Sequence, residues 1–381
     1  MSPAGDAFRD LSGGEPERTY FSPGRVNLIG EHTDYNGGLV LPVATHLGCR
    51  FAVAGNQGSA LCISSTAFPN DEVIVQLETL AEQSRRDRWS DYVVGAASEM
   101  LPHARHVTGL DIRIFSDLPH GGGLSSSAAI TVGIGTLLND FWQCGLSPAE
   151  IARVGQAAEN RFVGMNCGIL DPFAVAMCEA GHALLIDCCA LRYEPVPFPV
   201  DTYTLVVAHT GIRRALADSA YNQRRSESEQ AAAILSGTGP AKTLAQFSPG
   251  DLDALAGHPV LLRRARHVTS ENERVRAAVA ALERGAMTDF GSTLTASHAS
   301  LRNDYEVSCE ELDIMVEEAV ALEGAAGAKM TGAGFGGSIV AVVEKRMAAG
   351  FATELSERYM RRTNITPHIF ECMPASGARR L

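Results

Sequence analysis

The segment from Gly24 to Gly38 packs five chemically capable side chains into one glycine-punctuated stretch. It reads Gly-Arg-Val-Asn-Leu-Ile-Gly-Glu-His-Thr-Asp-Tyr-Asn-Gly-Gly, and the capable side chains are those of Arg25, Glu31, His32, Asp34 and Asn36. None of them serves an amphipathic helix or strand. Glycine adopts backbone conformations closed to other residues, so the segment can turn tightly and direct carboxylates and an imidazole toward a ligand. This composition predicts a binding site for a polyhydroxylated molecule.

A run of three glycines and three serines forms a second candidate site, within Leu118–Ile130. Glycines let the backbone approach a phosphate closely, and the free N–H groups of the helix expected after them bind anions. One of the hydroxyls of Ser125, Ser126 and Ser127 could ligate Mg²⁺. A tight turn with a serine N-cap is the alternative, but a cap needs fewer of these residues, so we predict phosphate binding. It is not a Walker A loop, because the dipeptide Gly-Lys does not occur in the chain.

A third glycine-rich segment, Thr331–Ser338, contains the spacing G-x-G-x-x-G at Gly332, Gly334 and Gly337. A dinucleotide-binding fingerprint needs a helix directly after it. The residues that follow are Ser-Ile-Val-Ala-Val-Val, which are typical of a strand. We therefore expect a loop that closes over a ligand from the other domain, with a plain hairpin turn as the alternative.

Two carboxylates stand in settings that leave their roles open. Asp171 lies in a nearly uncharged stretch and precedes Pro172, so it could cap a helix or serve a site. Glu159 falls in an expected helix that begins with the start signal Ser147-Pro-Ala-Glu150, and it could be an ordinary exposed glutamate. Their local sequence does not decide between these alternatives.

Composition and charge limit the class of protein. The chain has 381 residues, of which 45% are hydrophobic and 20% charged, so two packed globular domains are expected. The net charge of −12 argues against nucleic acid or an anionic membrane as the main partner, so an anionic ligand must be held by local chemistry. Nine cysteines without a C-x-x-C pair indicate neither a disulfide framework nor a zinc site. With no signal peptide or membrane span in the sequence, we expect a cytoplasmic protein.

The elements that must position these residues are strands and helices in mixed order. Before residue 200 we expect strands at Arg18–Ser22, Leu39–Val43, Arg50–Ala54, Asp111–Phe115 and His182–Asp187, and helices at Ser125–Trp142 and Ser147–Phe162. After it we expect strands at Thr204–His209, Ala328–Thr331 and Ser338–Glu344. Helices are expected at Ala217–Leu235, Leu261–Glu283, Cys309–Leu322 and Met347–Met360, with a flexible connection over 236–258. The prolines of Pro195–Asp201 indicate a crossing into a second domain.

Taken together, these segments resemble the GHMP small-molecule kinases and, within them, the galactokinases. Gly24–Gly38 resembles the galactokinase signature, Leu118–Ala129 the family's phosphate loop, and Lys329–Gly337 its third motif. Supporting matches are Trp89 with Tyr92, Cys167–Asp171, Tyr221–Arg225 and Ser297–Cys309. The resemblance runs from Ser22 to about Val343 and so covers nearly the whole chain.

The resemblance implies a two-domain α/β (α+β) fold. Residues 1–200 would form a ribosomal-protein-like N-terminal domain with the sugar motif, the phosphate loop and the catalytic aspartate, and residues 201–381 a ferredoxin-like C-terminal domain. The implied activity, with ATP as co-substrate and Mg²⁺ as cofactor, is transfer of the γ-phosphate to the C1 hydroxyl of α-D-galactose, which gives galactose 1-phosphate and ADP. The partners are then a small sugar and ATP, with neither nucleic acid nor membrane.

The family's functional residues carry over by position. Asp171 matches the catalytic aspartate beside the C1 hydroxyl, and Arg25 matches the arginine next to it and the transferring phosphate. Asp171 could remove the proton of that hydroxyl or mainly orient and polarise it. The implied sugar pocket consists of Arg25, Glu31, His32, Asp34, Gly168, Asp171 and Tyr221. The implied phosphate cradle consists of Gly121, Gly122, Gly123, Leu124, Ser125, Ser126 and Ser127, and the implied Mg²⁺ ligands are Ser127 and Glu159.

Four positions depart from the family's usual wording, namely Leu170, Pro172, Ser228 and Ser338. Pro172 matters most, because it stands where glutamine is common, removes a backbone N–H next to Asp171 and restricts that residue locally. Two other functions stay open. One is a kinase for an N-acetylhexosamine, arabinose or a uronic acid, the last disfavoured because Glu31 would face a second carboxylate unless a cation intervenes. The other is a non-catalytic sensor that binds galactose and ATP.

Overall fold

The computed structural model describes residues 15–119, 122–213 and 217–381, whose strands form three sheets. The first sheet has the order β14-β1-β3-β6-β4-β5, and β13 also pairs with β3. Its strands are β1 (Arg18–Asn27), β3 (Pro42–Gly55), β4 (Ala60–Ser65), β5 (Phe68–Gln76), β6 (Leu110–Ser116), β13 (Pro374–Ala375) and β14 (Arg379–Arg380). Neighbouring strands are antiparallel except β4 and β6, which run parallel.

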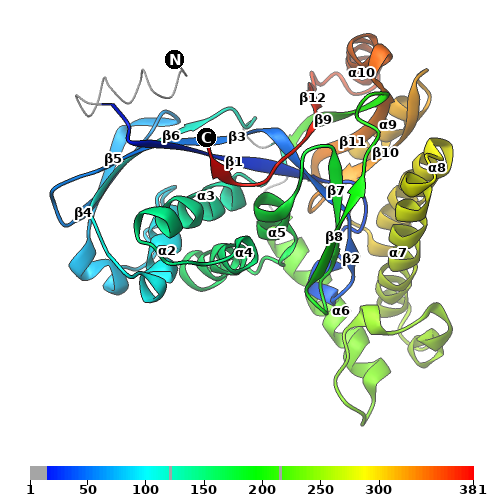
Figure 1. The fold of residues 1–381 in the computed structure, drawn as a ribbon. Coiled ribbons are helices and arrows are strands. Elements are labelled where there is room, and N and C mark those ends of the chain that lie inside the picture. Colours follow the sequence, from blue (N-terminus) through cyan, green and yellow to red (C-terminus); the bar gives the residue numbers. More distant parts are fainter. Residues whose placement is uncertain (1–14, 120–121, 214–216) are drawn as a thin grey trace.

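A layer of helices covers one face of the first sheet (Figure 1). These helices are α2 (Asp91–Met100), α3 (Ser126–Phe141), α4 (Pro148–Ala157) and α5 (Leu170–Met177). α3 contacts β1 and β3 as well as the other three helices, which is why its sequence is apolar on nearly every side. The predicted capping box of Ser147 and Glu150 starts α4, and a π-helical turn, η4 (Ala158–Val163), follows it. No described helix is long and apolar enough to cross a membrane.

The second sheet is antiparallel throughout and has the order β10-β11-β9-β12. Its strands are β9 (Tyr203–Arg213), β10 (Ala325–Thr331), β11 (Gly336–Glu344) and β12 (His368–Cys372). Helices α8 (Met287–Ser300), α9 (Glu310–Val320) and α10 (Ala348–Thr363) pack against it. The third glycine-rich segment joins β10 to β11, so a strand and not a helix follows it, as predicted.

A small third sheet, β2-β7-β8, lies between the first sheet and the long helices on the other side of the molecule (Figure 1). Its strands are β2 (Leu39–Val40), β7 (His182–Asp187) and β8 (Arg192–Pro197), and the long helices are α6 (Ala217–Ser236) and α7 (Pro259–Glu283). The connection between these helices, which we expected to be flexible, contains η5 (Leu244–Gln246) and η6 (Pro249–Leu255) and buries three leucines. The remaining short helices are η1 (Asp34–Asn36), η2 (Leu77–Glu82), η3 (Leu101–His103), η7 (Leu301–Tyr305) and η8 (Lys345–Met347).

The apolar core is continuous between the first and second sheets. One buried cluster joins Phe51 and Ile112 of the first sheet with Val207 and Val340 of the second. The last strands, β13 and β14, return to pair with β3 and β1, so residues from the end of the chain complete the first sheet. The domain boundary near residue 200 stays a prediction.

Most expected elements are confirmed, but the first sugar-motif residues are not in a turn. β1 continues through Arg25 to Asn27, and the expected strands at Leu39–Val43 and Arg50–Ala54 belong to β2 and to the single long strand β3. The elements α2, α8, β4, β5, β8, β12, β13 and β14 were not expected from the sequence. α8 has three threonines, three serines and a glycine among its 14 residues, all of them weak helix formers, and it forms because it packs against β10.

Gly291 lets α8 approach β10. A Cβ atom there would overlap the carbonyl group of Ala326. We expect Gly291→Ala to lower the free energy of unfolding by about 1–3 kcal/mol, because the atoms that the new Cβ would overlap belong to the backbone of β10 and cannot move easily. Urea denaturation checks this against Gly350→Ala in α10, where open space surrounds the Cβ position and alanine should stabilise by about 0.5–1 kcal/mol. Equal stability of the two variants would contradict the prediction.

Candidate functional site

The residues predicted to bind sugar, metal and phosphate line two adjoining cavities. The first, of about 330 Å³, is lined by Arg25, Glu31, His32, Asp34, Ser127, Glu159, Gly168, Asp171 and Tyr221 together with neighbouring residues. The second, of about 450 Å³, is lined by residues 122–127 and by the turn between β10 and β11. Arg25 and Ser127 line both cavities, so the cavities meet there. Gly121, which we predicted for the phosphate cradle, lies outside the described residues.

Arg25 and Asp171 face each other at this junction. Arg25 extends from β1, and its Nε and Nη2 atoms donate to Oδ1 and Oδ2 of Asp171, each at 2.5 Å. Its Nη1 atom donates to Gly123 O at 2.7 Å, and its backbone N–H donates to Leu124 O at 3.0 Å. The hydroxyl of Ser125 also donates to Oδ2 of Asp171. Because a bidentate arginine fixes the plane of a carboxylate, Asp171 and the glycine loop are held as one unit.

Asp171 is not a helix cap, which removes one of its two predicted roles. α5 begins at Leu170, its N-cap residue is Ile169, and no side chain caps it. Pro172 is therefore the third residue of the helix, where a backbone N–H has no intrahelical partner. The proline removes a group that the helix does not use, and Asp171 keeps helical backbone beside it. The structural effect of Pro172 is thus confined to the amide side chain that it lacks.

Asp34 lies against Gly168 in the wall of the first cavity. A Cβ atom at residue 168 would overlap the Asp34 carboxylate, so any larger residue there would displace that carboxylate. Burial and, after it, the charge of Asp171 raise the pKa of Asp34 to about 6. Tyr221 of α6 lines the same cavity and packs edge-on against Tyr35, with the ring centroids 5.5 Å apart. Predicted sugar residues from three separate segments therefore form one wall.

His32 is neutral, and its hydrogen bonds connect the sugar motif to the turn after β10. Its Nε2 atom lies 3.1 Å from Ala333 O and must donate, since a carbonyl oxygen only accepts. Its Nδ1 atom then accepts from the Tyr35 hydroxyl at 2.8 Å. Burial, followed by the nearby His267, lowers the pKa of His32 to about 3. Because both ring nitrogens are engaged within the protein, His32 lines the cavity mainly as a positioning residue.

A chain of hydroxyl groups continues from Tyr35 to α6. Its phenol oxygen lies 2.9 Å from that of Tyr305, which lies 2.7 Å from Oγ of Ser228. Ser228 is one of the departures from the family's usual wording, and its hydroxyl also donates to Arg224 O at 3.0 Å. The serine therefore supplies a hydrogen-bond partner to a buried tyrosine.

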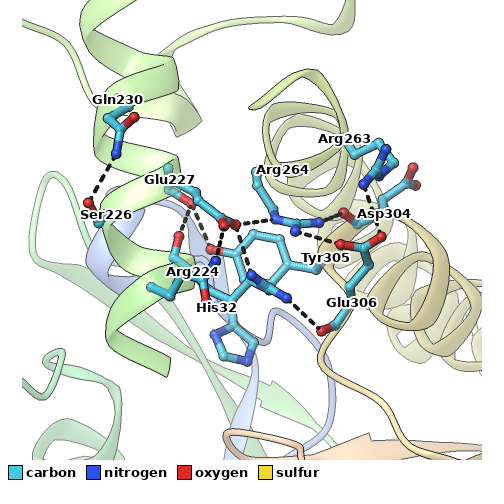
Figure 2. A network of polar contacts seen from close by, with 12 residues as sticks. His32, Arg224, Ser226, Glu227, Gln230, Arg263, Arg264, Asp304, Tyr305 and Glu306 are labelled. Atoms are coloured by element: carbon cyan, nitrogen blue, oxygen red, sulfur yellow. Dashed lines mark hydrogen bonds and ion pairs between the residues drawn. The ribbon is translucent and has the colours of Figure 1, made fainter. Parts of the chain in front are cut away.

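A charged network joins α6, α7 and the end of η7 beside these tyrosines (Figure 2). Its centre is Arg264, whose side chain is 2% exposed and which donates to Glu227 at 2.7 Å and to Glu306 at 2.6 Å. Figure 2 shows Tyr305 and His32 next to this network. The ring centroids of these two residues lie 4.9 Å apart, so the sugar motif rests on helices from the second half of the chain.

The glycine–serine run leads into α3 without a serine cap. α3 begins at Ser126, and Ser125 before it has a left-handed φ of 55° and makes no side-chain capping hydrogen bond. The N–H groups of the first helical turn thus remain for a ligand. Ser338 of β11, another departure from the family, donates to Gly122 O at 2.8 Å and ties the loop to the second sheet.

Ser127 and Glu159 lie together at the predicted metal site. Glu159 is buried, and its Oε1 atom has no hydrogen-bond partner among the described residues. Burial and then the charge of Asp171 raise the pKa of Glu159 to about 7, while hydrogen bonds from Ser127 and Thr131 lower it less. A buried, unpartnered carboxylate oxygen beside a hydroxyl fits Mg²⁺, which takes one or two carboxylates and completes its octahedron with water and phosphate. The described residues contain no cluster of three or more His, Cys, Asp or Glu side chains for a metal, so the protein would supply part of the ligand set.

Sequence reasoning missed Lys329 and two residues of α7. Lys329 of β10 is fully buried, and its ammonium group pairs with the carboxylate of Glu31. From α7, His267 donates to Glu31 O at 3.1 Å and Glu271 accepts from the N–H of Gly30 at 3.1 Å. Lys329 carried a signal, because a lone charge in the strand Ala-Ala-Gly-Ala-Lys-Met-Thr needs a buried partner. The α7 residues carried none, since that helix is polar along much of its length.

Three family models match the chain. The GHMP kinases N terminal domain matches residues 91–179, the GHMP kinases C terminal model matches residues 278–359, and the galactokinase galactose-binding signature matches residues 6–55. The matched segments include the expected sugar motif, the phosphate loop, both predicted metal ligands and the third glycine-rich segment.

Similar proteins match nearly the whole length of the chain. A galactokinase of Lacticaseibacillus paracasei is 40% identical over 378 residues, 98% of this chain and 97% of its own, and one of Chloroflexus aurantiacus is 42% identical over 375 residues, 97% of this chain and 95% of its own. The crystal structure of Lactococcus lactis galactokinase complexed with galactose superimposes with a TM-score of 0.94 at 34% identity, covering 99% of this chain and 98% of that one. A mevalonate kinase structure shares the fold, with a TM-score of 0.68 at 21% identity over 93% of this chain and 98% of its own.

The ionised carboxylate of Glu159 should lower the free energy of unfolding, although it is placed to bind a metal ion. Its carboxyl group ionises near pH 7 in the folded chain but near its ordinary value of 4.5 when unfolded. Between these values the folded state binds more protons, so stability falls as pH rises and the loss is complete above about pH 7. We expect Glu159→Gln, in metal-free buffer, to stabilise the protein by about 3 kcal/mol at pH 8 and hardly at all at pH 4.5. Urea denaturation at both pH values measures this, and a gain that does not depend on pH would contradict it.

Proposed function

The chain belongs to the GHMP kinase family and, within it, to the galactokinases, and we propose that its two cavities perform one reaction, the transfer of the γ-phosphate of ATP to the C1 hydroxyl of galactose. The observation that carries this proposal is the junction of the cavities. One cavity is lined by carboxylates and the other by a glycine–serine loop, and Arg25 lies in the wall of both. An acceptor and a donor placed on either side would meet at Arg25 and Asp171.

The acceptor side would hold a neutral sugar by its hydroxyl groups. Glu31 and Asp34 supply carboxylate oxygens, and the missing side chain of Gly168 leaves room for the Asp34 carboxylate beside the sugar. Tyr221 adds an aromatic face to the same cavity. Carboxylates whose outer lone pairs are free select hydroxyl donors, because a ligand without them would leave the buried oxygens unpaired.

The donor side would hold the phosphates mainly by backbone groups. Its lining includes the loop that leads into α3 and the first residues of that helix, where N–H groups and the helix dipole favour an anion. Among the described residues of this lining, Arg25 is the only lysine or arginine. A protein of net charge −12 can bind ATP in this way because the positive potential is local.

Ser127 and Glu159 would hold Mg²⁺ against the phosphates. The cation supplies charge neutralisation of the phosphate oxygens when it is bound. Glu159 would then stay ionised near neutral pH, since its unpartnered Oε1 atom gains a positive partner.

Asp171 would orient the sugar hydroxyl and receive its proton as the bond to phosphorus forms. Its Oδ1 atom accepts from Arg25, and its Oδ2 atom accepts from Arg25 and Ser125. An ionised carboxylate has about four lone-pair sites, so one hydroxyl can still bind. Because phosphoryl transfer passes through a loose transition state, placing the hydroxyl oxygen in line matters more than early removal of its proton. Arg25 would stabilise the charge on the transferring group.

A substrate panel tests this function. We expect purified protein with ATP and Mg²⁺ to release ADP with galactose at a higher kcat/KM than with N-acetylgalactosamine, arabinose or galacturonic acid. Chelation of Mg²⁺ should abolish the turnover. A higher kcat/KM for another sugar would assign the kinase to that sugar, and tight binding of galactose and ATP by calorimetry without ADP release would assign a sensor.

The role of Asp171 is tested by Asp171→Asn, which keeps the shape of the side chain. We expect kcat to fall by about a hundredfold or more, the usual range for a positioned acid–base group, with little change in melting temperature. Asp289→Asn is the matched control, because Asp289 is 68% exposed on α8, away from the cavities. Full turnover by Asp171→Asn would exclude the assigned role.

The pH dependence of galactose use should report Asp34. Its folded pKa of about 6 means that the carboxylate takes up a proton as pH falls through about 6, and a protonated carboxyl accepts fewer hydrogen bonds from a sugar. We expect kcat/KM for galactose to be level above about pH 7 and to fall roughly tenfold for each pH unit well below 6. Steady-state kinetics across this range measures it, and the limb should disappear in Asp34→Asn. A level profile down to about pH 4.5 would show an ordinary aspartate instead.

A further inference from the structure

We propose that Lys329 is a specificity-determining residue, whose ammonium group fixes the position and charge of Glu31 in the sugar cavity. The inference rests on the proposed function, since it concerns a sugar bound in that cavity. It assigns a role in substrate selection to the first residue of the family's third motif, Lys329–Gly337, whose other residues line the phosphate cavity in part.

Lys329 is a charged residue at a fully buried position. Its side chain is 0% exposed, in a strand whose other residues are small or apolar. The Nζ atom pairs with Oε2 of Glu31 and donates to Met330 O at 2.6 Å. Burial of an ammonium group is costly unless it is paired and hydrogen-bonded, so the lysine and Glu31 require each other.

Glu31 has one carboxylate oxygen left for a ligand. Its side chain is 2% exposed, and Oε2 meets Lys329, while Oε1 has no hydrogen-bond partner among the described residues. The residue lines the first cavity together with Asp34 and Asp171. A buried, unpartnered acceptor in the wall of a sugar cavity points to a sugar hydroxyl.

The backbone around Glu31 is held from α7, so only the side-chain torsions of Glu31 remain to set the direction of its carboxylate. The N–H of Gly30 donates to Glu271, and His267 donates to the carbonyl group of Glu31. Glu271 is itself paired with Arg274 at 2.6 Å and accepts from Ser297 at 2.5 Å. With the main chain anchored on both sides, Lys329 decides where the carboxylate points.

Lys329 also sets the charge that a sugar meets. Burial raises the pKa of Glu31, Lys329 opposes this rise, and the charge of Glu271 adds to it. Without the ammonium group, the Glu31 carboxylate would be a buried anion beside a second one and would take up a proton or turn from the cavity. Either change replaces a fixed acceptor with a poor one, so discrimination for the hydroxyl that Glu31 binds should be lost.

The experiment compares galactose with the four analogues that each lack one ring or side-chain hydroxyl other than C1. For wild type, we expect one analogue to lose at least about tenfold in kcat/KM because Glu31 loses its partner. We call the loss in kcat/KM of an analogue relative to galactose the penalty for its missing hydroxyl. Glu31→Gln identifies the hydroxyl that Glu31 binds, since the penalty for that hydroxyl should shrink to about threefold or less in this variant. We expect Lys329→Met to shrink the penalty for the same hydroxyl and to leave the other penalties and the KM for ATP within about threefold.

Two further variants keep this test decisive. Lys329→Gln retains a hydrogen-bond donor without charge and should behave as Lys329→Met does, so it replaces that variant if the methionine protein fails to fold. Lys345→Met is the matched control, because Lys345 is an exposed lysine that donates to Val200 O, outside both cavities, and it should leave all penalties unchanged. Measured melting temperatures separate loss of folded protein from loss of selectivity.

The inference is overturned if the Lys329 variants keep all four losses in kcat/KM, one for each missing hydroxyl, at the wild-type values. It is equally overturned if the loss that shrinks belongs to a different hydroxyl from the one that Glu31→Gln identifies. It is also overturned if the Lys329 variants lose all penalties equally. Failure of the proposed function would look different, since wild-type protein would then release no ADP with galactose.

Discussion

The ion pair between Arg25 and Asp171 is the contact on which the arrangement of the site depends. It joins the end of β1 to the start of α5, and the remaining donors of Arg25 reach the loop before α3. Three elements that are far apart in the chain are thereby fixed around one planar guanidinium group. Because the same group lies in the walls of both cavities, the position of a bound acceptor relative to a bound donor follows from this contact.

Compensation of buried negative charge explains how the other carboxylates differ. Asp171 pairs with Arg25 and Glu31 pairs with Lys329, so a cation compensates each of these carboxylates. Asp34 and Glu159 have no such ion pair among the described residues, and burial raises the pKa of both. An unpaired buried carboxylate costs stability, which a ligand can recover by supplying hydroxyl donors to Asp34 and a cation to Glu159. These carboxylates therefore favour ligand binding and lower the stability of the protein without its ligands.

The sugar motif depends on the second half of the chain for its shape. His267 and Glu271 hold its main chain, Lys329 holds Glu31, and Tyr305 packs beside His32 against the network around Arg264 (Figure 2). The serines at 228 and 338 fit this arrangement, since Ser228 is a hydrogen-bond partner of Tyr305 and Ser338 donates to Gly122 O in the first half of the chain. The continuous core and the return of β13 and β14 to the first sheet have the same effect.

Much of this could be read from the sequence, because some residue types have few uses. Glycines beside serines predicted the phosphate loop, and a capping box predicted α4. Carboxylates in an apolar or glycine-rich setting predicted residues that line the cavities. The alternatives for Asp171 and for Ser125 could not be decided, since a cap and a ligand use the same side chains in the same order. What only the tertiary structure decided was pairing: Arg25 with Asp171 across 146 positions, and Lys329 with Glu31. Sequence determines which charges exist, whereas the energy of a buried charge depends on what folding places beside it.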